Sequence, residues 1–321
     1  MNQFTSINPA GNPEKETQHE TVLIIGAGPA GLAAALYAAR AELTPLVLTG
    51  LQLGGQAALT FSIENYPGFP DGVGGAELGE LFQKQAERFG ARIEYDSMEQ
   101  VDLSSRPFKV STYGKTYLAD SLIIATGASS NLLNVPGEKL LTGKGVSYCA
   151  TCDGWFFKGK KVVVVGGGDS ALEEALFLTR FATSVTVVHR RDTFRAGAIL
   201  QNRIKADPKI NVIYDSVVSE VVGEQATRAV RLRNVKTGEE NLFETDGVFV
   251  FIGHTPNTEL FKGQLTLDDK GFIVVDTLMQ TSVPGVFAAG EAADPHFRQV
   301  ITSAGMGAAA AIQVTQFLGD K

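Results

Sequence analysis

Two segments of the chain show the same order of apolar and small residues. The first is a run of apolar residues at 21–25 that ends at Gly26 and precedes an alanine-rich stretch, 30–40. The second is a run at 161–165 that ends in three glycines and precedes 170–180. A strand, a glycine turn and a helix in this order are typical of nucleotide-binding βαβ units. The pattern therefore predicts two such units in one chain.

Further apolar runs lie between and after these two segments. Residues 120–127 and 284–290 are apolar and end in glycine, and residues 247–252 form a third short run. Strand patterns alternate with helix patterns throughout, which favours α/β layers built on parallel sheets. The predicted fold class is α/β with two Rossmann-like domains.

The domain boundaries are expected in loops rich in Gly, Ser, Asn and Pro. Two such loops, 127–134 and 253–257, bracket the second glycine-rich unit. We therefore predict an inserted domain, 131–254, within a discontinuous first domain made of 1–130 and 255–321. Two chain crossings of this kind would act together as a hinge.

Composition and charge narrow the function classes. The chain has 321 residues, 44% of them hydrophobic and 20% charged, as expected of a globular protein. Its 28 basic and 35 acidic residues give a net charge of −7, which argues against binding to nucleic acid through phosphate neutralisation. Residues 1–20 lack the apolar segment of a signal peptide or membrane anchor and are expected to be a disordered tail. No membrane association is predicted.

The first glycine fingerprint consists of Gly26, Gly28 and Gly31. In a dinucleotide site the first glycine allows the turn, the second lets a pyrophosphate approach the helix N-terminus, and the third permits close packing of helix and strand. The alternative is that these glycines serve turns only. An NAD site would place an acidic residue after the second strand, but here that strand is followed by Thr49 and Gly50, which disfavours NAD as the first ligand.

The second fingerprint runs from Gly166 to Ala171, and the next predicted strand, 184–188, is followed by a basic cluster. This cluster contains His189, Arg190, Arg191 and Arg195. Guanidinium groups form bidentate, charge-assisted hydrogen bonds with phosphate, whereas NAD sites carry a carboxylate at this place. We therefore predict NADP(H) rather than NAD(H). The alternative is a solvated basic turn.

The only two cysteines, Cys149 and Cys152, form a CxxC motif. The four histidines are unpaired in sequence, so a structural zinc site is disfavoured. Two thiols at this spacing can close a small disulfide ring, and a thiolate in such a motif is stabilised, which favours a redox-active dithiol. Because two cysteines so close together cannot staple a secreted fold across long loops, we expect a reducing compartment such as the cytoplasm. Asp153 follows directly, either as an acid/base for thiol–disulfide exchange or as a turn residue before Gly154.

These pieces predict a third component. NADPH delivers two electrons as a hydride, whereas a disulfide is reduced through thiolates, and a flavin is the usual cofactor that connects the two reactions. The first fingerprint is therefore assigned to FAD.

From about residue 20 onward, the chain resembles the low-molecular-weight thioredoxin reductases. The resemblance rests on several motifs together, of which the combination of CATCDG with HRRxxxRA is the most specific. They are GAGPAG at 26–31, GGQ at 54–56, ENYPG at 64–68, ATG at 125–127, CATCDG at 149–154, GGGDSALEEA at 166–175, HRRDTFRA at 189–196 and RQVITSAG at 298–305.

The resemblance implies FAD in the discontinuous domain, NADPH in the inserted domain, thioredoxin as the protein substrate and a homodimer. It implies that Cys152 lies nearer the flavin, that Cys149 attacks the partner disulfide, and that Asp153 is the acid/base. The residues implied at the FAD site are Gly26, Gly28, Ala30, Gly31, Gly55, Gln56, Asn65, Ala125, Thr126, Gly127, Gly290, Glu291, Arg298 and Gln299. Those implied at the NADPH site are Gly166, Gly168, Asp169, Ser170, His189, Arg190, Arg191 and Arg195.

One residue departs from the family pattern. The resemblance implies an Asp after Gly290 that contacts the ribityl chain of FAD, and this chain has Glu291. The longer side chain either reaches the same hydroxyls or alters the contact.

The predicted arrangement implies motion, because the dithiol and the nicotinamide share one domain while the flavin lies in the other. They must reach the flavin in turn, which predicts rotation about 127–131 and 253–256. Among other functions, a flavoprotein feeding a peroxidase usually carries an additional dithiol domain, and a ferredoxin or flavodoxin NADP reductase lacks the CATC motif. A redox sensor that binds both cofactors without turnover remains the alternative outside the enzymes.

Overall fold

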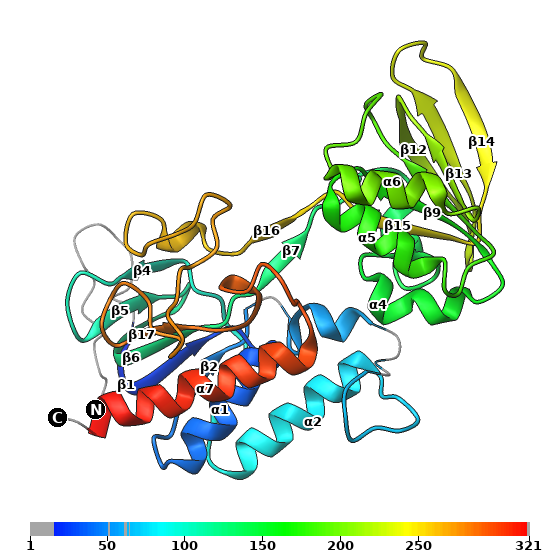
Figure 1. The fold of residues 1–321 in the computed structure, drawn as a ribbon. Helices are drawn as coiled ribbons and strands as arrows, with labels where there is room; N and C mark the ends of the chain where they lie inside the picture. The colour runs from blue at the N-terminus through cyan, green and yellow to red at the C-terminus, as the bar shows by residue number, and fades with distance from the viewer. Residues whose placement is uncertain (1–15, 51, 61–62, 64, 320–321) are drawn as a thin grey trace, which may run out of the picture. The chain divides into compact units, whose positions relative to one another are not determined.

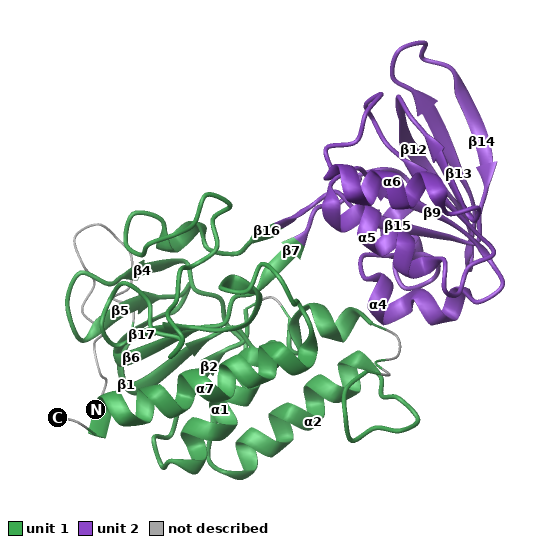
Figure 2. Ribbon diagram, in the orientation of Figure 1, with its two compact units in different colours: residues 1–129, 255–321 green, residues 130–254 purple. Residues whose placement is uncertain are grey.

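The computed structural model describes residues 16–50, 52–60, 63 and 65–319. The chain divides into two compact units, shown in Figure 2: unit 1 comprises 1–129 and 255–321, and unit 2 comprises 130–254. The first crossing between them lies one residue before the predicted position, and the second lies at the predicted position.

Unit 1 is built on a seven-stranded sheet within the described residues, ordered β3-β2-β1-β6-β5-β4, with β17 also paired to β6. The strands β3, β2, β1, β6 and β17 are joined by parallel pairing, whereas β4 and β5 are antiparallel additions. The bounds are β1 (Glu16–Ile25), β2 (Leu46–Leu48), β3 (Arg92–Glu94), β4 (Gln100–Asp102), β5 (Phe108–Ser111), β6 (Lys115–Ile124) and β17 (Val286–Ala288).

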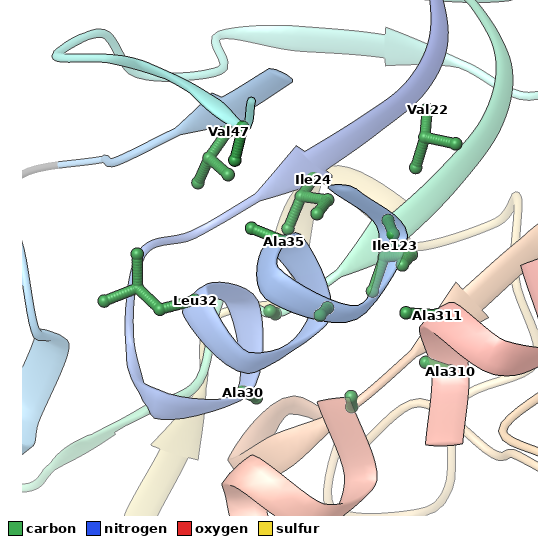
Figure 3. Close-up of a cluster of buried hydrophobic side chains, with 14 of the residues drawn as sticks. Val22, Ile24, Ala30, Leu32, Ala35, Val47, Ile123, Ala310 and Ala311 are labelled. Atoms are coloured by element: carbon green, nitrogen blue, oxygen red, sulfur yellow. The ribbon is translucent and has the colours of Figure 1, made fainter. Parts of the chain in front are cut away.

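Three long helices accompany this sheet in the described part of unit 1: α1 (Pro29–Arg40), α2 (Gly75–Arg88) and α7 (Val300–Gly319). Shorter helical turns are η1 (Gly55–Leu59), η3 (Glu259–Phe261) and η4 (Gly290–Ala292). Figure 3 shows alanines of α1 and α7 in one buried cluster with Ile24 and Ile123 of the sheet. The helices approach closely because their contact residues are small, and a Cβ at Gly307 would overlap the backbone of Ala30. The cluster holds α1, and with it the first fingerprint, in a fixed position.

The prediction of a disordered tail over residues 1–20 is wrong for residues 16–20. These residues form the first half of β1 and pair with β6, with Glu16 opposite Lys115. Glu20 is buried and pairs with Arg92 of β3, which compensates the burial of its charge. The prediction for residues 1–15 lies outside the described residues.

Unit 2 contains a five-stranded parallel sheet ordered β11-β10-β9-β15-β8. A second sheet, β12-β13-β14, is antiparallel and was not predicted. The helices are α3 (Glu138–Leu141), α4 (Ala150–Asp153), η2 (Gly154–Phe157), α5 (Asp169–Leu178) and α6 (Ala198–Ala206). The strands are β8 (Val146–Ser147), β9 (Lys161–Gly166), β10 (Ser184–Val188), β11 (Ile210–Ile213), β12 (Ser216–Gly223), β13 (Thr227–Asn234), β14 (Glu240–Glu244) and β15 (Gly247–Phe251).

The two segments that connect the units, β7 (Ala128–Ser130) and β16 (His254–Pro256), pair with each other (Figure 1). An asparagine forms a hydrogen bond at each end of this strand pair. Asn257 donates to the Thr126 carbonyl through its side chain at 2.9 Å, and the Asn131 N–H donates to the Gly253 carbonyl at 3.0 Å. Of the helices in the described residues, none combines the length and the hydrophobicity that crossing a membrane requires.

Candidate active site

The first fingerprint forms a tight turn between β1 and α1. Gly26 has φ +107°, a conformation that side chains disfavour, and a Cβ there would overlap the carbonyl oxygen of Ala125. A Cβ at Gly31 would overlap the carbonyl oxygen of Gly26. Both glycines are therefore needed for the turn itself.

Gly28 differs from its two neighbours in the fingerprint. It is the N-cap of α1, has ordinary extended backbone angles, and provides no side-chain cap for the helix. The nearest atom to a Cβ built there is the Cα of Gly55, 3.9 Å away. The first turn of α1 carries no acidic residue. An N-terminus of this kind leaves backbone N–H groups that bind an anionic group such as a pyrophosphate.

The other residues expected at the FAD site come from segments far apart in sequence. The Asn65 side chain donates to Oε1 of Gln299 at 3.1 Å, although 234 positions separate the two residues. A Cβ at Gly290 would lie 2.8 Å from Cβ of Ala30, so η4 lies against the start of α1. Gln56 is exposed in η1. Gly26, Ala125 and Gly290 lie at or just beyond the carboxyl ends of the parallel strands β1, β6 and β17, and η4 meets the start of α1 at this edge.

One buried polar atom at this edge has no partner within the described residues. It is Oγ1 of Thr126, the second residue after β6, while the Thr126 carbonyl accepts from Asn257. Gly127 follows with φ +68°. Because a buried hydroxyl without a hydrogen bond is costly, this atom fits a ligand that brings hydrogen-bonding groups of its own.

Glu291, the departure from the family pattern, lies in η4 and is half-buried. Burial raises the pKa of its carboxyl, with the negative charge of Asp294 acting in the same direction and the positive charge of Arg298 against it. The carboxyl also accepts a hydrogen bond from the backbone of Ala128, the first residue of β7. Glu291 therefore contacts the backbone at the start of the crossing between the units.

The second fingerprint, between β9 and α5, repeats the division seen in the first. A Cβ at Gly166 would lie 2.5 Å from the carbonyl oxygen of Phe251, and one at Gly167 would overlap the ring of His189. Gly168, the N-cap of α5, has nothing within 4 Å of such a Cβ and forms no side-chain cap. A phosphate therefore has room to approach the start of α5.

The basic cluster follows β10 directly. Arg190, Arg191 and Arg195 are exposed, and no ion pair engages them within the described residues. The backbone N–H of Arg195 donates to the Gly167 carbonyl at 2.8 Å, which holds the cluster beside the fingerprint. Asp169, in the first turn of α5, accepts from the Gly197 N–H at 2.8 Å and also ties this loop to the helix. Ser170 is exposed beside it.

His189 is placed differently from the arginines, because it is buried with only 5% exposure. Its ring lies against Gly167 and against Phe194, at 5.5 Å between ring centroids. Burial lowers the pKa of His189, and the three neighbouring guanidinium charges lower it further. The neutral ring therefore packs against Gly167 and helps to hold the glycine turn in place.

Cys149 and Cys152 are joined by a disulfide at the start of α4. Both residues are half-buried, and the Cys152 N–H points to the Cys149 sulfur at 3.2 Å. Trp155, three residues on, is 56% exposed. The disulfide is therefore partly accessible, and an exposed aromatic side chain follows it closely in the sequence.

Asp153 lies at the other end of α4 and is half-buried. Burial raises the pKa of its carboxyl, while a hydrogen bond of 2.6 Å from the Ser147 hydroxyl lowers it. Sequence analysis did not identify Ser147. A lone serine before the CxxC motif carries no periodic or spacing signal, and its contact depends on where β8 ends.

A second contact missed by sequence analysis lies behind the motif. Glu138 is 3% exposed and accepts hydrogen bonds from the N–H groups of Leu133 and Asn134 and from the Tyr148 hydroxyl. The three distances are 2.8, 2.7 and 2.9 Å. Since Tyr148 precedes Cys149, this carboxylate joins the residues that follow β7 to the redox motif.

A glycine-capped helix start beside an exposed guanidinium cluster, in one unit with a CxxC disulfide, is the chemistry of an enzyme that passes electrons between a nucleotide and sulfur. The family model for pyridine nucleotide-disulphide oxidoreductases matches residues 20–307. The chain belongs to this family. Membership of this family implies the use of NAD(P)H and a flavin.

Among the relatives of this oxidoreductase are several thioredoxin reductases. That of Rickettsia prowazekii is 52% identical over 302 residues, 92% of this chain and 97% of the relative. The thioredoxin reductase of Streptomyces coelicolor is 51% identical, and the match covers 92% of this chain and 93% of the relative. A solved thioredoxin reductase from Streptococcus pyogenes is 44% identical, with a TM-score of 0.90, covering 94% of this chain and 99% of that one.

Proposed function

We propose that this oxidoreductase is an NADPH-dependent thioredoxin-disulfide reductase. In this proposal unit 1 holds FAD, unit 2 holds NADPH, and the disulfide of Cys149 and Cys152 is the group that is reduced and reoxidised. Bound FAD would accept a hydride from NADPH and pass two electrons to that disulfide. The observation that carries the proposal is the half-buried disulfide beside Asp153, in the unit whose basic cluster suits a 2′-phosphate.

The residues of unit 1 fit FAD in three ways. The N-terminus of α1 is open for the pyrophosphate, since Gly28 leaves space and N–H donors there. Thr126 offers a buried hydroxyl that has no hydrogen-bond partner among the described residues. The amide pair of Asn65 and Gln299 supplies hydrogen-bonding groups in an exposed position. We assign the remaining predicted residues of unit 1, including Arg298 and Glu291, to the same site.

The residues of unit 2 support NADPH. Gly168 leaves the start of α5 open for the pyrophosphate. The exposed guanidinium groups of Arg190, Arg191 and Arg195 suit a 2′-phosphate better than the hydroxyl of NADH, because only the phosphate carries charge. His189 acts here by supporting the glycine turn.

Two observations, one on the relatives and one on this chain, support thioredoxin as the substrate. The named relatives are thioredoxin reductases, and one, from Mycobacterium leprae, is a bifunctional thioredoxin reductase/thioredoxin with 50% identity. In this chain, Trp155, three residues after Cys152, exposes a large aromatic surface, and exposed aromatic residues are typical of protein docking sites. Cys149 would attack the partner disulfide, Cys152 would lie nearer the flavin, and Asp153 would exchange protons with the thiols.

The proposal requires unit 2 to present its disulfide and its nucleotide to the flavin in turn. The paired strands β7 and β16 are the natural hinge, and Gly127 and Gly253 beside them have φ of +68° and +108°. A cross-link that joins the two units is expected to stop multiple turnover. Full steady-state activity of the cross-linked protein would exclude the rotation.

Two further assignments accompany the proposal. A dithiol that cycles with NADPH requires a reducing compartment, so we assign the enzyme to the cytoplasm. The family resemblance implies a homodimer, which size-exclusion chromatography with light scattering tests directly.

The proposed function is tested with Cys152→Ser. This variant is expected to lose thioredoxin reduction while NADPH still bleaches the flavin absorbance. Thr151→Ser is the matched control, because it alters the exposed residue between the cysteines and keeps both sulfurs. Surviving thioredoxin turnover in Cys152→Ser would refute the electron route, and flavin bleaching without multiple turnover in the unaltered protein would favour a redox sensor.

A further inference from the structure

Ser147 is the last residue of β8 and one of the buried polar residues of unit 2, at 4% exposure. It pairs in register with Phe249 of β15, so the parallel sheet fixes its position. Its hydroxyl therefore projects from a rigid element toward the loop that carries the CxxC motif.

That one hydroxyl contacts both ends of the motif. It donates to Oδ2 of Asp153 at 2.6 Å and accepts from the backbone N–H of Cys149 at 3.1 Å. The Cys149 carbonyl oxygen also lies 3.2 Å from the Ser147 hydroxyl. A hydroxyl has only one proton to donate, and the Asp153 carboxylate receives it because it is both the closer and the stronger acceptor. The sulfur-bearing segment and the carboxyl are thus held by a single group.

We propose that Ser147 is a positioning residue for disulfide exchange, because its hydroxyl fixes the Asp153 carboxyl and the Cys149 main chain relative to each other. The inference rests on the proposed function, which gives Asp153 the role of proton donor and acceptor.

The Ser147 hydroxyl counteracts the effect of burial on the pKa of Asp153. Burial raises the pKa of Asp153, and the Ser147 hydrogen bond lowers it. The neighbouring turn η2 contributes the apolar residues Trp155, Phe156 and Phe157, and α5, which also packs against α4, carries Asp169, Glu173 and Glu174. Two cations of this region, Arg180 and Lys160, lie over the rings of Phe177 and Phe157, respectively. In the reduced protein the thiols of Cys149 and Cys152 are two further titratable groups of the motif.

The exchange step balances with one carboxyl group. The Cys149 thiolate attacks the substrate disulfide, a mixed disulfide forms, and the released substrate thiolate takes the proton of Asp153. The Cys152 thiol then gives its proton to Asp153 and attacks Cys149. The disulfide of the protein re-forms, and the second substrate thiolate leaves with that proton. Two electrons and two protons pass to the substrate, and NADPH supplies the next electron pair.

Because Asp153 must alternate between acid and base, removing the Ser147 hydroxyl changes both steps. In Ser147→Ala the hydrogen bond to the ionised carboxylate is lost, so the pKa of Asp153 rises. At neutral pH we expect exchange between the pre-reduced holoenzyme and oxidised thioredoxin to slow about fivefold, as expected from the loss of one hydrogen bond. Reduction of the flavin by NADPH does not use this contact and is expected to keep its rate.

The decisive measurement is the titration of the Asp153 carboxyl in the oxidised holoenzyme, by NMR with carbon-13-labelled aspartate. Ser147→Ala should titrate at higher pH than the unaltered protein, and Ser147→Thr, which retains a hydroxyl, should restore the original midpoint. Ser121→Ala is the matched control, because it removes a buried hydroxyl that donates to the Gly285 carbonyl in unit 1. An unchanged midpoint in Ser147→Ala would overturn the inference.

Two further results separate the possible failures. If Asp153→Asn reduces thioredoxin at the normal rate with an unchanged pH profile, the acid/base role in the proposed function is wrong, whatever Ser147 does. If Ser147→Ala does not fold, the unaltered protein still decides the question. The Cys149 amide resonance should then titrate with the same midpoint as the Asp153 carboxyl, and an amide that is insensitive to that titration would refute the shared hydroxyl.

Discussion

Replacing two arginines of the basic cluster tests the assignment of NADPH most directly. In the double variant Arg190→Gln and Arg191→Gln, both side chains keep hydrogen-bonding ability but lose charge. The structure makes the result interpretable, because neither guanidinium group is held in an ion pair within the described residues. The next residue in the sequence, Asp192, forms its ion pair with Lys236, at 3.3 Å, and not with either arginine. The substitution therefore breaks no ion pair within the described part of unit 2.

The expected magnitude follows from the exposure of the two side chains. A hydrogen bond to a charged group contributes about 1.5–3 kcal/mol, and exposed charges fall at the lower end of that range. Two contacts of about 1.5 kcal/mol each correspond to a rise in the KM for NADPH of roughly 100-fold. NADH lacks the 2′-phosphate, so its KM should change less than about threefold.

The assay is steady-state thioredoxin reduction with each nucleotide, together with binding of NADP⁺ and NAD⁺ to the oxidised protein. Arg203→Gln is the matched control, because Arg203 is an exposed arginine of the same unit, in the last turn of α6. It is expected to change neither KM. Equal effects of the double variant on NADPH and NADH would refute the assignment of the cluster to the 2′-phosphate.

Three further predictions test the glycines and two carboxyl groups. Gly168→Ala should leave the free energy of unfolding within about 0.5 kcal/mol of the original and weaken NADPH binding, whereas Gly31→Ala should destabilise unit 1 by about 1–3 kcal/mol, as measured by urea unfolding. Glu138→Gln should cost about 2 kcal/mol in the same assay, since one amide oxygen cannot accept all three hydrogen bonds, and a loss below about 0.5 kcal/mol would contradict that role. Because burial raises the pKa of Glu291, the penalty on its charge is absent in acid and grows as the pH rises through its raised pKa. Glu291→Gln should therefore stabilise the flavin-free protein at neutral pH but not in acid, and an equal thermal stability of the two proteins at pH 7 would contradict this.

The sequence predicted the parts of the fold that depend on local pattern. The strand β10 was expected at 184–188 and is observed there, and α1 begins one residue before the expected stretch. Both segments combine strong apolar character with a glycine or helical composition close by. The antiparallel sheet β12-β13-β14 was not predicted, because its strands are half-polar and exposed on one side, as the charged residues of β13 and β14 show.

The site was predicted less evenly. The glycines, the cysteines and the arginines carry their own motifs, so the sequence alone indicates the chemistry. The pairing of Asn65 with Gln299 joins residues 234 positions apart, and only the family resemblance brought them into one site. Sequence analysis missed Ser147 and Glu138 because each acts through hydrogen bonds that form only in the folded chain. A serine or a glutamate is common in any sequence, and neither belongs to a periodic pattern or a motif here.

The two fingerprints contain glycines of two kinds, and the difference separates a turn from a ligand site. At Gly26, Gly31 and Gly166, a Cβ would collide with the chain itself, so a purely structural turn would require glycine there. At Gly28 and Gly168 the backbone angles are ordinary and a Cβ meets nothing closer than 3.9 Å, so a structural turn would accept alanine. Both are N-caps of helices without a side-chain cap, at the positions where a pyrophosphate would approach. Turn geometry alone leaves the smallness of these two residues unexplained, whereas a phosphate bound against each helix explains both.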